Sequence, residues 1–265
     1  LAKGECVSEL WVDKELTALR AKQAGYLSLS FETIAGFGAH GAIVHYEATE
    51  ETNAALDTRG LLLLDSGAHY LNGTTDITRT IAIGEPTAEE KRVYTLVLKG
   101  HLCLQNMHFP EGTTGLQLDT AARMSMWREG YDFGHGTGHG VGHVLGVHEG
   151  PVQIRKNHRG DTVLPIKVGQ VITDEPGIYV AGKFGVRIEN CLLCIEDRQT
   201  EYGKFLKFEP LTLCPYDSSL IDVAMLTEEE RTWLNEYHAM VCEKLFPLLP
   251  NDDEKAWLIR ATAKL

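Results

Sequence analysis

Four histidines gather in one glycine-rich segment, and their type and spacing make this segment the clearest candidate for chemistry in the chain. They are His135, His139, His143 and His148, all within residues 133–151. Surface solubility does not require so many imidazoles in so short a stretch. Such a composition is typical either of a reaction centre or of a mobile tract that binds metal adventitiously.

Two aspartates lie at the ends of β-rich runs in the first third of the chain. The apolar run Leu61–Leu64 predicts a buried strand that ends at Asp65, Asn72-Gly73 predicts a tight turn, and Thr75–Ile83 predicts a returning strand that carries Asp76. The two aspartates are therefore expected on neighbouring strands. A carboxylate that follows four leucines is costly to bury unless a cation pairs with it. The ordinary alternatives are a turn cap at Asp65 and a solvated strand position at Asp76.

Two glutamates form a second acidic pair. Two β-rich runs flank Gly182, and a hairpin centred there would bring Glu175 and Glu189 opposite each other. Opposed like charges destabilise a sheet, so a cation between them is expected. Four carboxylates with one or more imidazoles form a ligand set for two divalent ions, which in such sites activate water and stabilise the oxyanion of a hydrolysed carbonyl group.

These residues, in this order, resemble the dinuclear site of the pita-bread metallopeptidases, and most closely the Xaa-Pro aminopeptidases (aminopeptidase P). The resemblance runs from about Ser30 to the C-terminus. It is carried by the strings LLLLDSGAHYLNGTTDITRT, GHGTGHGVGHVLGVHEGP, DEPGIYVAGKFGVRIEN and FEPLTLCPYD. It implies that Asp65 is a terminal ligand of one ion, that His139 and Glu175 are ligands of the other, and that Asp76 and Glu189 bridge both. The implied cofactor is two divalent ions, with Mn²⁺ favoured and Zn²⁺ or Co²⁺ as alternatives.

The resemblance also implies roles in catalysis. His135 and His148 would orient the substrate and stabilise the tetrahedral intermediate, and His45 would lie close to the substrate. Glu175 would carry a proton to the departing prolyl nitrogen. Arg187 would hold a ligand carboxylate in place. Without the resemblance, His45 would be interpreted as a core histidine at the end of an apolar strand, and Arg187 as a surface arginine.

The expected fold class is α/β, or more strictly α+β. The resemblance implies a pita-bread fold, with a curved, mainly antiparallel sheet covered by helices and an internal pseudo-twofold. Capping boxes at Thr87 and Thr227 and the apolar periodicity predict helices whose apolar faces cover one side of the ligand-bearing sheet. These helices are predicted over residues 5–22, 88–107, 114–129, 228–246 and 253–263.

Length and composition agree with one large domain. The chain has 265 residues, 43% of them hydrophobic, and we expect residues 1–265 to form one catalytic domain with a helical extension over about 226–265. The formal charge of −12 argues against nucleic acid as a partner, and no apolar run is long enough to span a membrane. Six cysteines show no disulfide framework, which favours a cytoplasmic protein, and the pair Cys191 and Cys194 is expected in the core.

The chain opens on Leu1 rather than Met. In the family that it resembles, the catalytic domain follows N-terminal domains that help to form the substrate pocket and the oligomer. We therefore expect upstream domains that this chain lacks and a homodimer in the full-length protein.

The expected activity is release of the N-terminal residue from peptides with proline in second position. The alternative within enzymes is a prolidase that cleaves Xaa-Pro dipeptides, against which the tail EPLTLCPYD and its helical extension argue. A catalytically inactive pita-bread binding module and a metal-free relative such as creatinase are disfavoured because all five ligands are present. Zincin chemistry is absent because His148-Glu149 is followed by no histidine three residues on.

Overall fold

The computed structural model describes residues 6–144, 146–157 and 164–265 of the chain. Every strand pair within these residues is antiparallel. The α-helices are α1 Glu9–Ala21, α2 Ala88–Gln105, α3 Gly115–Trp127, α4 Glu228–Leu245 and α5 Asp252–Ala261. Short 3₁₀ helices are η1 Gly38–Ala42, η2 Ser218–Leu220, η3 Val223–Met225 and η4 Phe246–Leu248. The expected mixed class with antiparallel sheets is confirmed.

A three-stranded sheet in the order β2-β3-β6 carries the first acidic pair. Its strands are β2 Ile34–Phe37, β3 Gly60–Ser66 and β6 Ile77–Ile83. Side chains alternate between the two faces of β3, as strand geometry requires. Leu61 packs in a core with residues of α2, whereas Leu62 and Leu64 pack with Val12 of α1 on the other face.

Between β3 and β6 the chain makes a small hairpin of β4 Ala68–Tyr70 and β5 Gly73–Thr74, and β4 also pairs with β1 Tyr26–Leu29. Tyr70 pairs with Gly73, so the turn consists of Leu71 and Asn72. The predicted turn at Asn72-Gly73 was therefore wrong by one residue. Gly73 instead begins the returning strand, with a φ of 152°.

A six-stranded sheet in the order β7-β14-β13-β10-β8-β9 carries the histidine-rich segment. Its strands are β7 His108–Pro110, β8 Gly138–Gly140, β9 Glu149–Ile154, β10 Val171–Asp174, β13 Asn190–Thr200 and β14 Gly203–Pro210. Beside it, β11 Gly177–Val180 and β12 Phe184–Arg187 form the hairpin that Gly182 predicted. Gly182 has a φ of 72°, a left-handed conformation that glycine adopts without strain.

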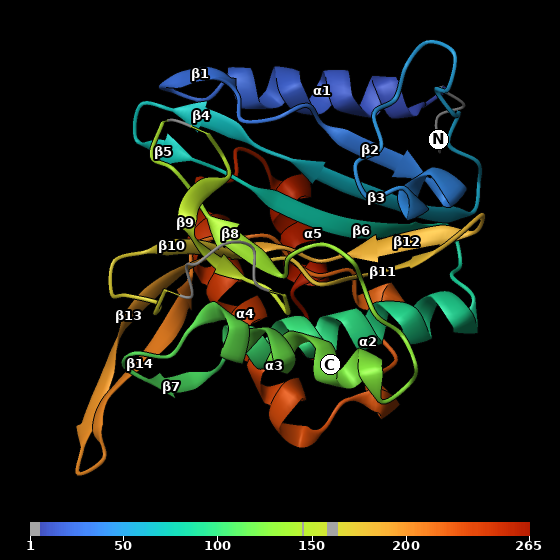
Figure 1. Ribbon diagram of the computed structural model, residues 1–265. Helices are drawn as coiled ribbons and strands as arrows, with labels where there is room; N and C mark the ends of the chain where they lie inside the picture. The colour runs from blue at the N-terminus through green and yellow to red at the C-terminus, as the bar shows by residue number, and fades with distance from the viewer. Residues whose placement is uncertain (1–5, 145, 158–163) are drawn as a thin grey trace.

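Helices cover the sheets from both sides rather than from one. Figure 1 shows α1 above the sheets and α2, α3 and α4 below them. The expectation that all helices cover one side was wrong, because β3 has two apolar faces and each needs a partner. The main core joins α2 to the β11–β12 hairpin and to α4, through side chains such as Val97, Ile178 and Leu234.

Helix boundaries follow their capping residues. Both predicted capping boxes are present, with Thr87 and Thr227 accepting from the backbone of Glu90 and Glu230. The first helix begins at Glu9, because Ser8 caps it, and not at residue 5, which lies outside the described residues. The other four helices end one to two residues before the predicted boundaries.

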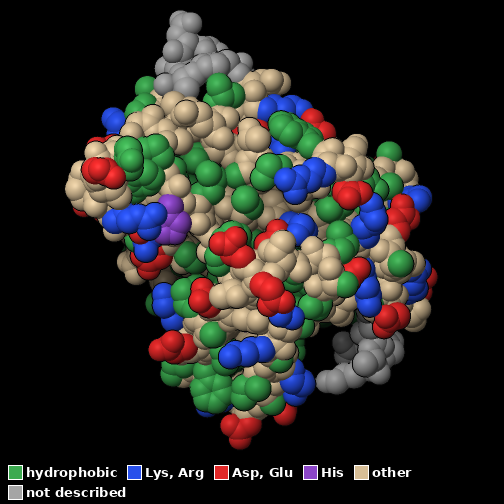
Figure 2. Space-filling view, turned by 90° about the horizontal axis from the view of Figure 1, so that it is seen from below, with side chains coloured by type: hydrophobic (Ala, Val, Ile, Leu, Met, Phe, Trp, Pro, Cys, Tyr) green, Lys and Arg blue, Asp and Glu red, His purple; other side chains and the backbone are tan. Residues whose placement is uncertain are grey.

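Lys, Arg, Asp and Glu side chains are interspersed over the helical face that Figure 2 shows, with no large patch of one sign. None of the described helices has the length and hydropathy that a membrane crossing requires. Cys191 and Cys194 are both buried, and all six cysteines are free, as expected.

Candidate metal centre

The first acidic pair lies at one end of the β3–β6 ladder. Asp65 is opposite Thr78, and Asp76 directly precedes β6. The two aspartates therefore lie on neighbouring chain segments, and both side chains are buried.

The second acidic pair lies between the β10–β13 ladder and the β11–β12 ladder, which continue each other in the same register. Asp174 pairs with Asn190 on one side, and Gly177 pairs with Arg187 on the other, so Glu175 and Glu189 are opposite each other between them. The Glu189 amide donates to Thr78 O at 3.0 Å, which places Glu189 beside the β3–β6 sheet and the aspartates.

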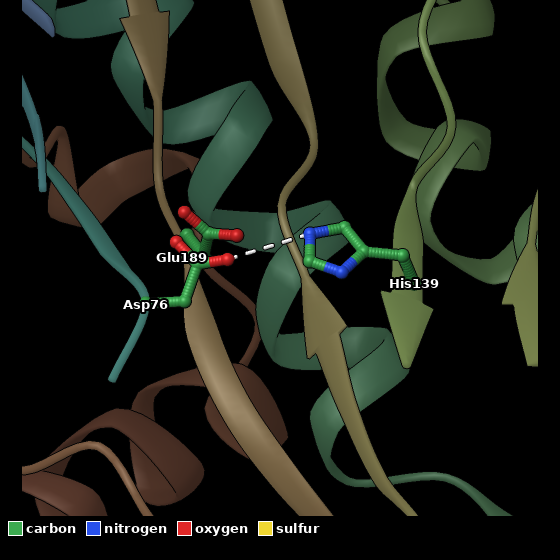
Figure 3. A group of neighbouring side chains, drawn as sticks. All are labelled: Asp76, His139 and Glu189. Atoms are coloured by element: carbon green, nitrogen blue, oxygen red, sulfur yellow. Dashed lines mark ion pairs between the residues drawn. The ribbon is translucent and has the colours of Figure 1, made fainter. Parts of the chain in front are cut away.

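His139 reaches the carboxylates from β8. Its Nδ1 lies 2.9 Å from Gly140 O, an arrangement in which the ring donates there and leaves Nε2 facing the acids. Nε2 lies 3.4 Å from Asp76 Oδ2 and 3.5 Å from Glu175 Oε1. In Figure 3 the ring points across from β8 toward Asp76 and Glu189, and ligand atoms of the three residues all lie within 4.8 Å of one another. The strand that carries His139 lies close against β10, and this packing needs a glycine beside the histidine. A Cβ on Gly138 would lie 1.9 Å from Thr173 O.

One cavity of about 770 Å³ joins these groups to the other candidate residues. Its lining includes all nine candidates from the sequence: His45, Asp65, Asp76, His135, His139, His148, Glu175, Arg187 and Glu189. His143 does not line it, and instead its backbone carbonyl accepts a hydrogen bond from Thr74 Oγ1 at 2.9 Å. The structure therefore separates His143 from the other three histidines of the segment.

The electrostatics of the cluster fit divalent cations. Burial raises the pKa of Glu175 to about 8 against the opposing effects of His139 and Arg187, and burial followed by the charges of Asp76 and Asp65 raises that of Glu189 well above its ordinary value. Asp65 Oδ1 is buried with no hydrogen-bond partner in the described part of the chain. Crowded carboxylates with an unsatisfied oxygen are stabilised when cations bind between them. The oxygen-rich donor set suits hard or borderline divalent ions.

Arg187, predicted to hold a ligand carboxylate, is an internal residue only 2% exposed, so the alternative of a surface arginine is excluded. Its Nη2 donates to Asp65 Oδ2 at 2.7 Å and its Nη1 to the Tyr179 hydroxyl at 2.8 Å. Tyr179 was missed at the sequence level. Its hydroxyl lies 2.8 Å from His135 Nε2, so one tyrosine links the arginine that holds Asp65 to a candidate substrate-binding histidine.

Of the remaining candidate histidines, His45 and His148 are exposed at the cavity mouth, and His135 is largely buried. The rings of His139 and His148 meet edge to face at 4.2 Å, and burial, followed by the charge of His139, lowers the pKa of His148. His45 is exposed at the mouth, so its interpretation as a core histidine was wrong. Burial lowers the pKa of His135 to about 3, and its Nδ1 lies 2.7 Å from Gly136 O. A neutral His135 therefore donates through Nδ1 and accepts the Tyr179 O–H through Nε2.

Two buried ionic groups that sequence reasoning missed hold the backbone around the cavity. The Glu9 carboxylate accepts from Phe37 N, His40 Nδ1, Tyr46 Oη and Ala54 N at 2.7 to 2.9 Å, which fixes the segment that carries His45. On α3, Arg123 pairs with Asp119 at 2.6 Å and donates to the carbonyls of Phe133 and His135. Of these contacts, only the Asp119–Arg123 ion pair could have been expected from the sequence, through its i,i+4 spacing on a predicted helix.

Glu189 has its own supports from β6. Thr78 Oγ1 donates to Glu189 Oε2 at 2.7 Å, and Arg79 Nη1 donates to the Glu189 carbonyl at 2.7 Å. Both donors lie on β6, which directly follows Asp76. This one strand therefore positions Asp76 of the first acidic pair through the chain and Glu189 of the second pair through hydrogen bonds.

Two family models match the chain. The model of metallopeptidase family M24 matches residues 2–196, and the model of the C-terminal region of the M24 peptidases matches residues 204–265.

Curated relatives match nearly the whole chain. Aminopeptidase P2 of Arabidopsis thaliana is 45% identical over 99% of this chain and 37% of its own length, and a probable Xaa-Pro aminopeptidase P of Paracoccidioides brasiliensis (strain Pb03) is 45% identical over 98% of this chain and 43% of its own length. The chain therefore spans about two fifths of the length of these relatives.

A solved structure of an enzyme is similar over the whole chain. It is the X-prolyl aminopeptidase of Caenorhabditis elegans, described as a cytosolic enzyme with a di-nuclear active site. It has a TM-score of 0.93 and 42% identity, and the match covers 100% of this chain and 43% of that one. This similarity identifies the architecture as the pita-bread fold. With a family model over residues 2–196 and a cavity that gathers the acidic and histidine side chains, the chain belongs to metallopeptidase family M24.

Proposed function

We propose that the protein to which this chain belongs is a metal-dependent aminopeptidase that releases the N-terminal residue from peptides with proline in second position. The observation that carries the proposal is the convergence of the four candidate carboxylates and four histidines in one cavity. The similarity to proteins named aminopeptidase P over nearly the whole chain supports the proposed substrate class.

Five side chains would hold two divalent ions: Asp65 on one ion, His139 and Glu175 on the other, and Asp76 and Glu189 between them. Asp76, His139 and Glu189 already lie close enough to share an ion. Bound there, divalent cations activate water and polarise the scissile carbonyl. We assign Mn²⁺ because oxygen donors outnumber nitrogen donors in this set.

The protein side chains then orient the substrate and move protons. Glu175 lies beside both His139 and His135, and it would carry a proton from the attacking water to the prolyl nitrogen. His148 would donate a hydrogen bond to the developing oxyanion, and His45 would contact the substrate at the mouth. His135, whose two ring nitrogens are bonded to Gly136 O and the Tyr179 hydroxyl, would orient the substrate by contact with its ring. Arg187 would keep Asp65 in its binding orientation through the bond at 2.7 Å.

A prolidase is the second candidate. The prolidase of Pyrococcus furiosus has a TM-score of 0.64 and 33% identity, and its match covers 71% of this chain, against the full coverage by the C. elegans aminopeptidase. The C-terminal segment of residues 204–265 also has its own family model. These observations favour the aminopeptidase, and the complete set of candidate ligands argues against an inactive binding module.

The full-length protein is proposed to be a cytoplasmic homodimer with further domains upstream of residue 1 that complete the substrate pocket. Six free cysteines fit a reducing compartment, and the C. elegans enzyme is described as cytosolic. The length of the relatives supports the upstream domains.

The activity is tested with the full-length protein, loaded with Mn²⁺, on an Arg-Pro-Pro and an Arg-Ala-Ala peptide. A pocket shaped for a pyrrolidine ring and a tertiary amide accepts the first peptide and fits the second poorly. We expect rapid release of arginine from the proline peptide and far slower release from the other. The isolated 265-residue chain should be weakly active or inactive. Equal cleavage of both peptides would refute the specificity, and a fully active isolated chain would refute the need for upstream domains.

A further inference from the structure

Two polar side chains lie directly behind the second acidic pair. Asp174 and Asn190 form the last rung of the β10–β13 ladder, and the next residues toward the cavity are Glu175 and Glu189. The glutamates line the cavity, whereas Asp174 and Asn190 are fully buried and contact residues of α2. This arrangement follows from strand geometry, because neighbouring residues point to opposite faces of a sheet. Groups on α2 can therefore act on the two glutamates from behind.

His101 of α2 contacts Asp174 at two points. Its Nδ1 lies 3.2 Å from the Asp174 carbonyl oxygen and 3.2 Å from Oδ2 of the same residue. The second contact has the distance of an ion pair without the geometry of a hydrogen bond, and neither carboxyl oxygen has a hydrogen-bond partner in the described part of the chain. Burial raises the pKa of Asp174, and His101 opposes this shift. His101 therefore stabilises an acid that is costly to bury.

The other ring nitrogen of His101 connects to Asn190. Nε2 lies 2.9 Å from the Tyr216 hydroxyl, and Asn190 Nδ2 donates to the same hydroxyl at 3.1 Å. Because Asn190 Nδ2 is a donor only, the hydroxyl hydrogen of Tyr216 goes to His101 Nε2. The ring then carries its own hydrogen on Nδ1, where it faces Asp174. A continuous chain of hydrogen bonds thus links the two residues of the last rung.

Asn190 has a further support that Asp174 does not share. Arg79 Nη2 donates to Asn190 Oδ1 at 2.8 Å. Among the described residues, the Asp174 carboxyl group has no comparable donor. Asp174 directly precedes Glu175, so the support that His101 supplies matters most for this glutamate.

The two glutamates tend to separate when no cation lies between them. They are opposite each other, and the charges of Asp76 and Asp65 add to the negative potential around both. Like charges at opposed positions destabilise a sheet. The chain of bonds on the other face counteracts this repulsion, because it ties the last rung of the ladder to α2.

We propose that His101 is a positioning residue that holds Glu175 in place for binding ions together with Glu189. It is fully buried and acts through Asp174. This inference rests on the proposed function, in which both glutamates are ligands. Loss of a side chain that orients a ligand typically lowers metal affinity roughly 10- to 100-fold, because binding must then also order the ligand.

Two amide substitutions test which ring nitrogen matters. The metal-free, full-length protein is titrated with Mn²⁺ in a calorimeter. In His101→Gln the amide reaches the position of Nε2 and the donor to Asp174 is lost, so we expect Mn²⁺ to bind roughly 10- to 100-fold more weakly. In His101→Asn an amide donor takes the position of Nδ1 and should restore most of the wild-type affinity. Wild-type affinity in His101→Gln, or equal losses in the two variants, would overturn the proposal.

Kinetics and a matched histidine separate positioning from general loosening of the core. On an Arg-Pro-Pro peptide, His101→Gln should be slow at limiting Mn²⁺ and should recover its kcat in excess Mn²⁺, with the KM for the peptide unchanged. A kcat that stays low in excess Mn²⁺ would contradict a role in ion binding. His238 is also fully buried, and its Nε2 accepts from Tyr216 N at 3.1 Å. His238→Gln is therefore the control and should keep the wild-type affinity, and an equal loss there would overturn the proposal.

The titration also separates this inference from the proposed activity. A wild-type protein that binds two Mn²⁺ ions but cleaves Arg-Pro-Pro and Arg-Ala-Ala peptides equally would refute the substrate class, and the loss in His101→Gln would still support the inference. Equal affinities of wild type and His101→Gln for Mn²⁺ would refute the inference alone. A wild-type protein that binds no Mn²⁺ would refute the metal centre and the inference together.

Discussion

The floor and the mouth of the cavity differ in how their side chains are held. The floor consists of the ring of His139 and the carboxylates of Asp65, Asp76, Glu175 and Glu189. Asp65, Asp76 and Glu189 are no more than 8% exposed. Floor side chains are bound directly, as Arg187 binds Asp65 and Thr78 binds Glu189. The mouth consists of the exposed residues His45 and His148, whose side chains face solvent.

At the mouth it is the backbone that is anchored. Glu9 fixes the segment around His45 through Phe37, Tyr46 and Ala54. The difference indicates that the floor is organised to bind ions at fixed positions, whereas the mouth presents side chains that can adjust to a peptide. Substitutions in the floor should therefore change metal content, and substitutions at the mouth should change turnover or stability alone.

The largest effect is expected when a bridging carboxylate of the floor is removed. In Asp76→Asn or Glu189→Gln one lost oxygen weakens two ion sites at once, so both metal content and activity should fall below detection. Elemental analysis of the full-length protein should give two ions per chain in the wild type. Glu201→Gln, at an exposed position of the β13–β14 hairpin, is the matched control and should keep both ions. One tightly bound ion, or none, in fully active protein would contradict the dinuclear site.

A smaller effect distinguishes the two neighbouring histidines, one at the floor and one at the mouth. His139→Ala should lower metal content, because its Nε2 faces Asp76 and Glu175. His148→Ala should keep the metal and reduce kcat by roughly two to three orders of magnitude, the usual effect of losing one oxyanion donor. Metal analysis and kinetics on the same samples decide the point. If His148→Ala lost metal and His139→Ala did not, the assignment of the two histidines would be reversed.

The smallest effect is expected at the anchor below the mouth. In Glu9→Gln the amide cannot accept from all four donors, so buried donors are left unsatisfied at a cost of about 1–3 kcal/mol in the free energy of unfolding. Chemical denaturation measures this loss, and metal content should stay unchanged because Glu9 does not line the cavity. Glu15→Gln, an exposed change on the same helix, is the control. Metal loss in Glu9→Gln with unchanged stability would contradict the assignment of Glu9 to the anchoring of the mouth.

The floor was more predictable from the sequence than its supports. Glu175 and Glu189 could be placed opposite each other because one turn at Gly182 determines the register of the whole hairpin. Strand and helix positions followed from local apolar patterns and capping residues in the same way. The choice of His139 among four histidines needed the family resemblance, because spacing alone does not distinguish them.

The supports depend on contacts between residues far apart in the chain. Glu9 meets Tyr46, and Arg187 meets Asp65, across separations of 37 and 122 residues. No local pattern marks such partners, so Glu9, Tyr179 and Arg123 had no predicted role. The side of the sheet covered by α1 was missed for the same reason, because it depends on which face of β3 the other helices leave open.

The shared register of the two ladders limits how the chain can change length during evolution or engineering. Between Val180 and Phe184 the hairpin has room for three residues, and a single insertion or deletion there would turn Glu189 to the opposite face of the sheet. The hairpin of β13 and β14 carries no such restriction at its far end, where Tyr202 is 83% exposed. Loop libraries, tags or inserted domains therefore belong at residues 200–203, whereas the turn at Gly182 should keep its length.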